Sequence, residues 1–329
     1  MKAIKVLITG ISGSGASYLA EYIVNNHPEV ELHGTFRSNS SRSQKNIQEI
    51  ANKLFLHDCD LDDYTVTHQL IAGLKPDIVF HIASYANVRE SWDKPVFTLQ
   101  NNIISTANLL EAIRSAAGIH PRIQMCSTPE VYGQVDPKNI PIDESCPINP
   151  NNPYAVSKFA QESLGYSYFK GFGLPVIITR MSTYLNPRRA DLFATAFAMQ
   201  VARIEAGLQK ELRHGNLDST RTILDPRDCA SAYWAAIEKG ESGEVYNIGG
   251  NTVVTVGEFL EVLKIKARRT IPSIADKSLF RPADITLQII NSGKFSKQTG
   301  WQPKYSFEES VEYLLGHCRR TVQEELASR

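Results

Sequence analysis

The feature that most constrains the fold is a regular alternation of short apolar runs and helix-length segments in the first half of the chain. Parallel neighbouring strands require such intervening segments, because the chain must cross back over the sheet before each new strand. Runs that are apolar almost throughout fit strands covered on both faces. The sequence therefore predicts an α/β fold with a doubly wound parallel sheet. The apolar runs are IKVLIT (4–9), VELHGTF (30–36), DIVFHIA (77–83), RIQMCS (122–127) and PVIITRM (175–181), and the helical patterns between them include SYLAEYIVNNH (17–27), YTVTHQLIAGL (64–74) and ISTANLLEAIRSAAG (104–118).

After Arg180 this rhythm changes, and most of the chain has helical patterns with short strands between them. One later run, EVYNIGG (244–250), again has the pattern of a sheet strand, which indicates that the chain returns to the first sheet. The second part should cover the carboxyl ends of the strands, where ligands bind in such folds. We therefore expect two domains: residues 1–179 with 224–250 form the doubly wound one, and residues 180–223 with 251–329 form a smaller mixed α/β C-terminal domain.

Composition excludes several classes of protein. The 329 residues carry a formal net charge of zero, which gives no reason to expect a nucleic acid or an anionic membrane as partner. No apolar run approaches the length of a membrane span, and the N-terminal run reaches a glycine too soon for a signal peptide. The five cysteines are scattered without CxxC spacing, which argues against a zinc site and favours a reducing compartment. We expect a cytoplasmic protein without a metal site.

A glycine-rich turn follows the first strand and opens the first helix. Gly10, Gly13 and Ala16 give the spacing GxxGxxA, with Gly15 as an extra small residue. In a Rossmann fold the first glycine permits the tight turn, and the second lets the backbone approach a pyrophosphate at the helix N-terminus. The alternative is a plain strand–helix turn, but the position in the first βα unit favours a cofactor. We predict dinucleotide contacts at Gly10, Gly13, Ser14 and Gly15.

The end of the second strand indicates which dinucleotide binds. The segment FRSNSSR (36–42) contains Arg37, Ser38 and Arg42 and no carboxylate. An NAD site usually has an acidic residue here, whereas a guanidinium suits the 2′-phosphate of NADP. We therefore favour NADP over NAD, with a solvated surface arginine as the alternative. After the third strand, Asp60 and Leu61 are placed to bracket the adenine, although Asp60 could instead cap a helix.

Tyr154 and Lys158 lie four residues apart at the start of a predicted helix, so they share one helix face. Pro153 suits the first turn of this helix, with Asn151 or Asn152 as its cap. An ammonium near a phenol favours the phenolate and lowers its pKa, which lets the tyrosine exchange a proton with a sugar hydroxyl. The alternative is that both are surface residues. Their place after a dinucleotide turn and the hydroxyl-rich STPEVYG (127–133) favours catalysis.

With these motifs the chain resembles the extended short-chain dehydrogenase/reductases that modify nucleotide sugars. The resemblance covers essentially the whole chain and is strongest to the branch of GDP-mannose 4,6-dehydratase and GDP-4-keto-6-deoxymannose reductase. It would make the second domain the nucleotide-sugar-binding one. The segments that carry the resemblance are TGISGSGA (9–16), HIAS (81–84), STPEVYG, YAVSK (154–158) and, for the branch, residues 186–197, 215–234 and 281–301.

The resemblance also implies roles for individual residues. Thr128, Tyr154 and Lys158 match the reductase triad, and Glu130 matches the glutamate that removes the proton from sugar carbon 5. The alternative for Glu130 is a structural one, a partly buried carboxylate that accepts hydrogen bonds from nearby backbone amides. Arg221 matches an arginine that clamps the nucleotide diphosphate. The alternative is that Arg221 and Arg227 are structural ion-pair residues. The remaining implied contacts are Ala83 with the cofactor, and Ser84, Asn186, Arg188, Asn216 and Arg281 with the substrate.

Two departures from the branch leave the reaction open. The dehydratases commonly have Asp or Ser before the glutamate, where it supports the acid for the departing hydroxyl, but here Pro129 can donate no proton. Either Glu130 serves as both base and acid, or the enzyme is a reductase or epimerase that acts only at carbon 4. Thr183 stands where an asparagine is usual, so the sugar, and GDP over UDP or CDP, depend on the resemblance. A sensor that binds NADP without turnover is a third possibility.

The resemblance further implies a homodimer or homotetramer. The apolar helix at 104–118 and the helix from Tyr154 could pair across a two-fold axis. The same apolar stripes could instead cover the sheet.

Overall fold

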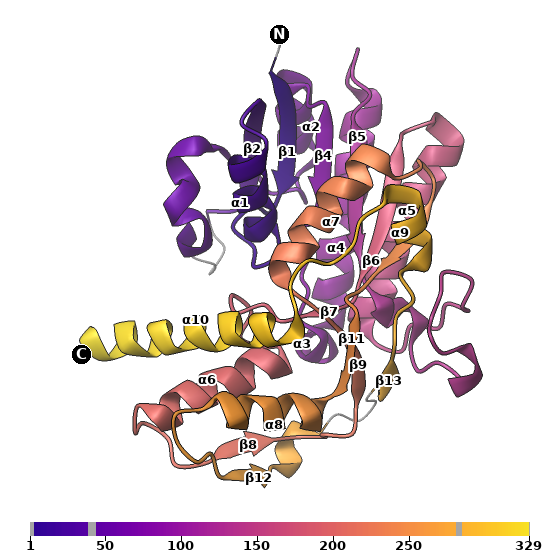
Figure 1. The fold of residues 1–329 in the computed structure, drawn as a ribbon. Coiled ribbons are helices and arrows are strands. Elements are labelled where there is room, and N and C mark those ends of the chain that lie inside the picture. The colour runs from indigo at the N-terminus through magenta and orange to yellow at the C-terminus, as the bar shows by residue number, and fades with distance from the viewer. Residues whose placement is uncertain (1–2, 39–43, 281–284, 329) are drawn as a thin grey trace.

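The computed structural model describes residues 3–38, 44–280 and 285–328 and contains a seven-stranded sheet in the order β10-β6-β5-β4-β1-β2-β3 (Figure 1). Every neighbouring pair in this sheet is parallel, and the order reverses between β1 and β4. The predicted doubly wound fold is therefore confirmed. The strands are β1 (Ile4–Thr9), β2 (Val30–Phe36), β3 (Phe55–Asp58), β4 (Ile78–His81), β5 (Arg122–Ser127), β6 (Val176–Met181) and β10 (Val245–Ile248).

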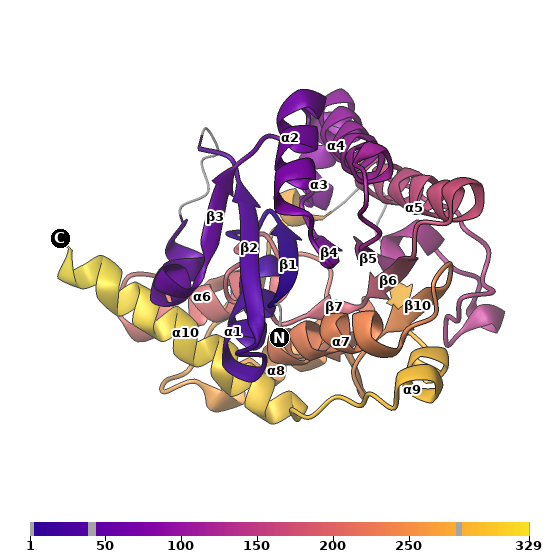
Figure 2. The ribbon, with the colours of Figure 1, turned by 90° about the horizontal axis from the view of Figure 1, so that it is seen from above.

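Helices cover both faces of this sheet, and Figure 2 shows the two layers from above. Side chains alternate between the faces along each strand, so Val6 and Ile8 of β1 face one apolar core while Leu7 faces the other. This explains why the strands are apolar throughout. One layer consists of α1 (Ala16–Asn26), the 3₁₀ helix η1 (Gln44–Lys53) and α7 (Pro226–Lys239), and the other of α2 (Tyr64–Leu74), α4 (Pro95–Ser115) and α5 (Pro153–Phe172).

A further apolar core, which we call the second core to distinguish it from those of the sheet domain, lies beyond the carboxyl ends of the strands. It is formed by α6 (Phe193–Glu205), α8 (Val256–Lys266), α10 (Phe307–Ala327) and β9 (Thr220–Leu224). Figure 1 shows α10 running between this core and the sheet domain. The remaining elements are short: β7 (Thr183–Tyr184), β11 (Thr252–Thr255) and β13 (Leu287–Gln288) join β9 in a small sheet, β8 (Leu212–His214) pairs with β12 (Ser273–Ala275), and α3 (Val88–Asp93), α9 (Gly293–Thr299), η2 (Pro129–Tyr132), η3 (Pro137–Asn139) and η4 (Lys277–Leu279) lie in the connections.

The chain passes repeatedly between the sheet domain and the second core. After β9 the chain returns to the sheet domain as α7 and β10. It returns once more as α9, so that Phe295 and Trp301 pack in the apolar core beneath α1 and α7. The division of the chain into domains remains a prediction about ligand-binding roles. None of the helices in the described part of the chain has the length and apolar character to span a membrane. Nor do three or more His, Cys, Asp or Glu side chains gather into a metal-binding cluster among these residues.

Candidate active site

A cavity of about 600 Å³ opens at the carboxyl ends of the central strands. It extends from the glycine turn after β1 to the N-terminal part of α5, and it spans the point between β1 and β4 where the order of the strands reverses. Ligands of open parallel sheets bind at this position. The cavity brings together most of the residues that the sequence singled out: Gly10, Gly13, Ser14, Gly15, Arg37, Ser38, Asp60, Leu61, Ala83, Ser84, Thr128, Glu130, Tyr154 and Lys158.

Side chains at the glycines of the turn after β1 would come too close to neighbouring backbone atoms. Gly10 has a φ of +65°, and a Cβ there would lie 3.1 Å from the Cα of Ala83. A Cβ on Gly13 would lie 3.0 Å from the carbonyl oxygen of Gly10. The opposite loop is held by Thr9, whose hydroxyl accepts hydrogen bonds from the backbone amides of Ile82 and Ala83 at 3.1 Å each. A pyrophosphate can therefore approach the backbone amides at the start of α1 closely.

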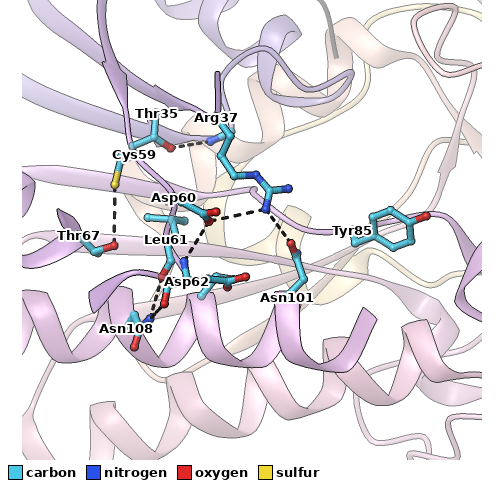
Figure 3. A network of polar contacts seen from close by, with 12 residues as sticks. Thr35, Arg37, Cys59, Asp60, Leu61, Asp62, Thr67, Tyr85, Asn101 and Asn108 are labelled. Atoms are coloured by element: carbon cyan, nitrogen blue, oxygen red, sulfur yellow. Dashed lines mark hydrogen bonds and ion pairs between the residues drawn. The ribbon is translucent and has the colours of Figure 1, made fainter. Parts of the chain in front are cut away.

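The cavity wall at the ends of β2 and β3 is polar (Figure 3). The guanidinium of Arg37 donates to Asn101 Oδ1 at 3.1 Å and lies 3.7 Å from Asp60 Oδ1. Asp58 accepts the amide of Ser38 at 3.0 Å, and hydrogen bonding from Ser38 lowers the pKa of this carboxyl. Asn101 was not anticipated, because it lies on α4, far along the chain from Arg37. Asp58 was not singled out either, although it lies two residues before Asp60.

Two smaller questions about this wall are also answered. Asp63 caps α2 by accepting the amide of Val66 at 3.1 Å, so Asp60 is not the cap of this helix. Arg42 lies outside the described residues.

Tyr154 and Lys158 lie on the first turns of α5, which Asn152 caps by accepting the amide of Ala155 at 2.8 Å. Lys158 is 1% exposed, and its side-chain ammonium has no hydrogen-bond partner among the described residues. Burial lowers the pKa of this ammonium. A buried ammonium that lines a cavity fits the hydroxyls of a cofactor ribose. Burial raises the pKa of Tyr154, so in the free protein the expected lowering by a neighbouring lysine does not dominate.

The segment after β5 presents Glu130 to the cavity. Thr128 caps the short helix η2 by accepting the amide of Glu130 at 3.3 Å, and Pro129 occupies its first turn. Proline suits that position because its missing N–H would have no partner there. The Glu130 carboxylate accepts a hydrogen bond at 3.1 Å from the side chain of Asn152. Glu130 is also among the residues that line the cavity.

A buried polar network supports this segment from beneath. Glu162 accepts two hydrogen bonds from Arg180, at 2.9 and 2.6 Å, and another from Ser127. Arg180 also donates to the Tyr132 hydroxyl at 2.7 Å, and that hydroxyl donates to Asn247 at 2.9 Å. The network links α5, β6, β5, η2 and β10. Sequence reasoning did not find it, since its members are far apart in the chain.

Of the described residues implied to bind substrate, Ser84 lines this cavity, whereas Asn186, Arg188, Asn216 and Arg221 are not among its lining residues. Asn186 is buried and accepts the amide of Arg188 at 2.9 Å. Asn216 accepts the amide of Asp218 at 2.9 Å. Arg221 donates to the carbonyl oxygens of Thr220, at 2.9 Å, and Ile285. Arg281 lies outside the described residues.

Arg188 has partners on α1 instead of in the cavity. Its guanidinium binds Glu21 at 2.5 Å and Ser17 at 2.9 Å, and lies 4.0 Å from the centre of the Tyr18 ring. This placement does not support the implied contact with a ligand, because the fork of the guanidinium is already occupied.

Several cavity residues were not anticipated. Arg189 lines the cavity although the sequence singled out its neighbour, and the arginine pair in NPRR was the only available signal. Thr183, noted for its unusual identity, also lines the cavity. The other unanticipated members near Tyr154 include Cys126, Tyr184, Tyr233 and Gln288.

Tyr154 and Lys158 at the floor of a dinucleotide cavity define the class of this protein, the extended short-chain dehydrogenase/reductases. Comparison with known families narrows the class. The family model described as GDP-mannose 4,6 dehydratase matches residues 7–314, and the chain belongs to this family. The resemblance inferred from the sequence is thereby confirmed.

Individual relatives include both dehydratases and a reductase. The chain is 34% identical to the GDP-6-deoxy-D-mannose reductase of Pseudomonas aeruginosa, over 76% of this chain and 83% of that protein. It is 28% identical to the GDP-mannose 4,6-dehydratase of Yersinia enterocolitica, over 98% and 96% of the two chains. Among solved structures, RMD from Pseudomonas aeruginosa complexed with NADPH superposes with a TM-score of 0.82 at 28% identity, covering 96% of this chain and 99% of that one.

Proposed function

We propose that the protein is an NADP-dependent nucleotide-sugar 4,6-dehydratase that acts on a GDP-hexose such as GDP-mannose. Family membership supports the substrate class, and the relative solved with NADPH, together with Arg37, supports the cofactor. The observation that carries the proposal is the Glu130 carboxylate, which lines the same cavity as Tyr154 and Lys158. Chemistry confined to carbon 4 has no need of a carboxylate at this point.

The proposed chemistry uses the side chains in sequence. Bound NADP supplies the acceptor, and later the donor, of a hydride. Lys158 binds the cofactor ribose, and Tyr154, with Thr128 beside it, takes the proton of the hydroxyl on sugar carbon 4. The resulting ketone acidifies the proton on carbon 5, which Glu130 removes. Because Pro129 can donate no proton, Glu130 then returns this proton to the hydroxide that departs from carbon 6, which leaves as water. The unsaturated ketone would then take the hydride back at carbon 6 and a proton from solvent at carbon 5, so that the cofactor ends oxidised, as it began.

A turnover experiment tests the proposal. The protein loaded with NADP⁺ is incubated with GDP-, UDP- and CDP-hexoses, and mass spectrometry follows the loss of water. We expect dehydration of a GDP-hexose with no net change of nicotinamide absorbance. Glu130→Gln should lower the rate about 10²–10⁴-fold and retain NADP⁺ binding. Asp136→Asn, an exposed carboxylate that caps η3, is the matched control. Dehydration by Glu130→Gln at the wild-type rate would contradict the assignment.

A carbon-4 reductase is the second candidate, and epimerisation at carbon 4 is its variant. Pro129 favours it, as does the 34% identity to a GDP-6-deoxy-D-mannose reductase. Such an enzyme consumes stoichiometric NADPH and requires a 4-keto substrate. Its turnover would tolerate Glu130→Gln but not Tyr154→Phe. Unchanged turnover in Tyr154→Phe would indicate that neither enzyme assignment is correct.

We further infer that the nucleotide lies over the second core. The family resemblance supports contacts from Asn186, Asn216, Arg221 and Arg281, and a guanidinium suits a diphosphate. Alanine at Arg221 should weaken GDP binding while NADP⁺ binding is retained, which titration calorimetry can measure.

We also propose that the protein is cytoplasmic and that it assembles as a homodimer or homotetramer. Exposed apolar side chains gather on two adjacent helices, with Ile104 on α4 and Phe159 and Tyr166 on α5. The five cysteines form no disulfide, which fits a reducing compartment.

A further inference from the structure

Two buried polar groups in the cavity wall, besides the ammonium of Lys158, have no hydrogen-bond partner in the part of the chain that the structure describes. They are the hydroxyl of Ser182 and the side-chain amide nitrogen of Gln288, and both residues line the cavity. Gln288 is only 4% exposed. Burying an amide N–H without an acceptor is costly, so native proteins rarely do it without a functional reason. The amide of Gln288 therefore indicates a contact that a ligand in the cavity completes.

The backbone around Gln288 is held on both sides. Gln288 belongs to β13, which lies beside β9 (Figure 1) and places Gln288 in register with Arg221. On the other side of β13, the amide of Ile142 donates to the carbonyl oxygen of Ile289 at 2.7 Å. The side chain of Gln288 thus starts from a fixed position in the cavity wall, which reduces the entropy lost when a ligand binds to it.

This part of the wall adjoins the segment that carries Glu130. Two residues before Gln288, Thr286 donates its amide, at 2.9 Å, and its hydroxyl, at 3.5 Å, to the side chain of Gln134. Two residues after Gln288, Ile290 packs in the apolar cluster that η2 forms with its neighbours. Alternate side chains of an extended segment share one face, so Gln288 faces the segment that follows β5.

The sheet topology separates this wall from the predicted adenosine end of the cofactor. Arg37 and Asp60 follow β2 and β3, whereas the segment of Glu130 follows β5, across the reversal of the strand order. Arg221, the register neighbour of Gln288, is the residue proposed to bind the nucleotide diphosphate. Gln288 therefore adjoins both the strand of that proposed site and the segment of the proposed base. In a nucleotide sugar, the hexose is the part that reaches from one to the other.

We propose that Gln288 is a specificity-determining residue whose carboxamide donates a hydrogen bond to a hydroxyl oxygen of the hexose. The inference rests on the proposed function, since it takes a nucleotide sugar as the ligand. A carboxamide both donates and accepts hydrogen bonds, which suits a hydroxyl group because a hydroxyl does the same. A ligand without this hydroxyl leaves the buried amide unpaired and should bind more weakly for that reason.

The test compares a nucleotide sugar with its free nucleotide by titration calorimetry. The protein is loaded with NADP⁺ and carries Tyr154→Phe, so that the ligand is not consumed, and it is titrated with GDP-mannose and with GDP. Gln288→Met has a side chain of nearly the same length without the amide. It should weaken the binding of GDP-mannose about tenfold and leave the binding of GDP unchanged.

A second glutamine provides the matched control. Gln124 on β5 is buried and does not line the cavity, and its amide donates to the Thr179 hydroxyl at 2.8 Å. Gln124→Met should leave both affinities unchanged and lower the midpoint of urea unfolding, because it removes a hydrogen bond. Gln288→Met should not lower this midpoint in the free protein, because the amide that it removes has no partner there. If Gln288→Met fails to fold, Gln288→Leu takes its place in both measurements.

The outcomes separate this inference from the proposed function. Unchanged affinity for both ligands in the folded variant, or an equal loss of affinity for GDP-mannose and GDP, would overturn the hexose contact. A loss confined to GDP-mannose, in a protein whose wild type dehydrates no nucleotide sugar, would overturn the proposed function and leave the role of Gln288 intact. A wild-type protein that binds neither ligand would overturn both.

Discussion

The buried residue His81, at the end of β4, should make the stability of the protein depend on pH. It is 2% exposed, and its ring nitrogens lie 3.0 Å from the Thr9 hydroxyl and 2.8 Å from that of Thr106. Burial lowers its pKa from 6.5 to about 3. The unfolded chain therefore binds a proton that the folded protein excludes, so this contribution to stability is present above pH 6.5 and is lost as the pH falls towards 3.

We expect His81 alone to lower the free energy of unfolding by about 2 kcal/mol between pH 7 and pH 5. Urea unfolding at the two pH values measures this change. His81→Gln retains polar atoms but cannot titrate, so its stability should fall less over the same interval. Equal losses in the two proteins would show that His81 does not titrate as its burial requires.

Individual residues also show where sequence reasoning reached its limit. Tyr154 and Lys158 could be predicted because their spacing on one helix is a local property. Arg188 and Arg189 are adjacent, and only the three-dimensional path of the loop decides that one contacts α1 and the other lines the cavity. Asn101 joins Arg37 from a different helix, which no local pattern reveals.

At the scale of elements, the ion pair of Glu162 and Arg180 ties α5, the helix that carries Tyr154 and Lys158, to β6. Both side chains are almost fully buried, at 5% and 6% exposure. Arg180→Met leaves a buried carboxylate without its partner and should cost about 3–5 kcal/mol in the free energy of unfolding. The exposed pair of Arg114 and Glu111 is the control, and Arg114→Met should have a much smaller effect in the same urea experiment. Similar losses of unfolding free energy in Arg180→Met and Arg114→Met would contradict the larger contribution expected of the buried pair.

The turn between β1 and α1 permits a second test. Gly10 and Gly118 both have left-handed backbones, with φ of +65° and +72°. A Cβ on Gly118 meets nothing within 4 Å, whereas one on Gly10 meets the backbone of Ala83. Alanine at either position should cost about 1–2 kcal/mol for the backbone alone. Only Gly10→Ala should also weaken NADP⁺ binding, which a fluorescence titration measures; equal affinities would exclude a close approach at Gly10.

Elements were the part of the fold that the sequence predicted best. The strands of the main sheet follow from apolar runs, and Asn152 caps α5 as one of the two residues proposed for this role. Their order in the sheet was not predicted, because the crossover rule fixes the handedness of each connection and not which strand lies beside which. The short strands of the second core were not located beforehand, because β7 and β13 contain two residues each and carry no periodicity.

At the scale of the molecule, the apolar face on α4 and α5 should pair with a second copy of the chain. Ile104 is 46% exposed on this face, while Ile265 on α8 is 82% exposed. We expect the wild type and Ile265→Glu to sediment as dimers or larger, and Ile104→Glu to sediment as a monomer, because a buried carboxylate opposes association. A wild-type monomer, or an oligomer in Ile104→Glu, would place the interface elsewhere.

The chain crosses repeatedly between the sheet domain and the second core, and this affects how the protein folds while it is being synthesised. The main sheet acquires its edge strand β10 only after β9 has been synthesised, and Phe295 and Trp301 complete the apolar layer on one side of it from near the end of the chain. A nascent chain that ends after β6 therefore exposes an unpaired strand edge and an open apolar face. Such surfaces attract chaperones and promote aggregation. Late truncations should thus leave little native enzyme, however much of the catalytic machinery they spare.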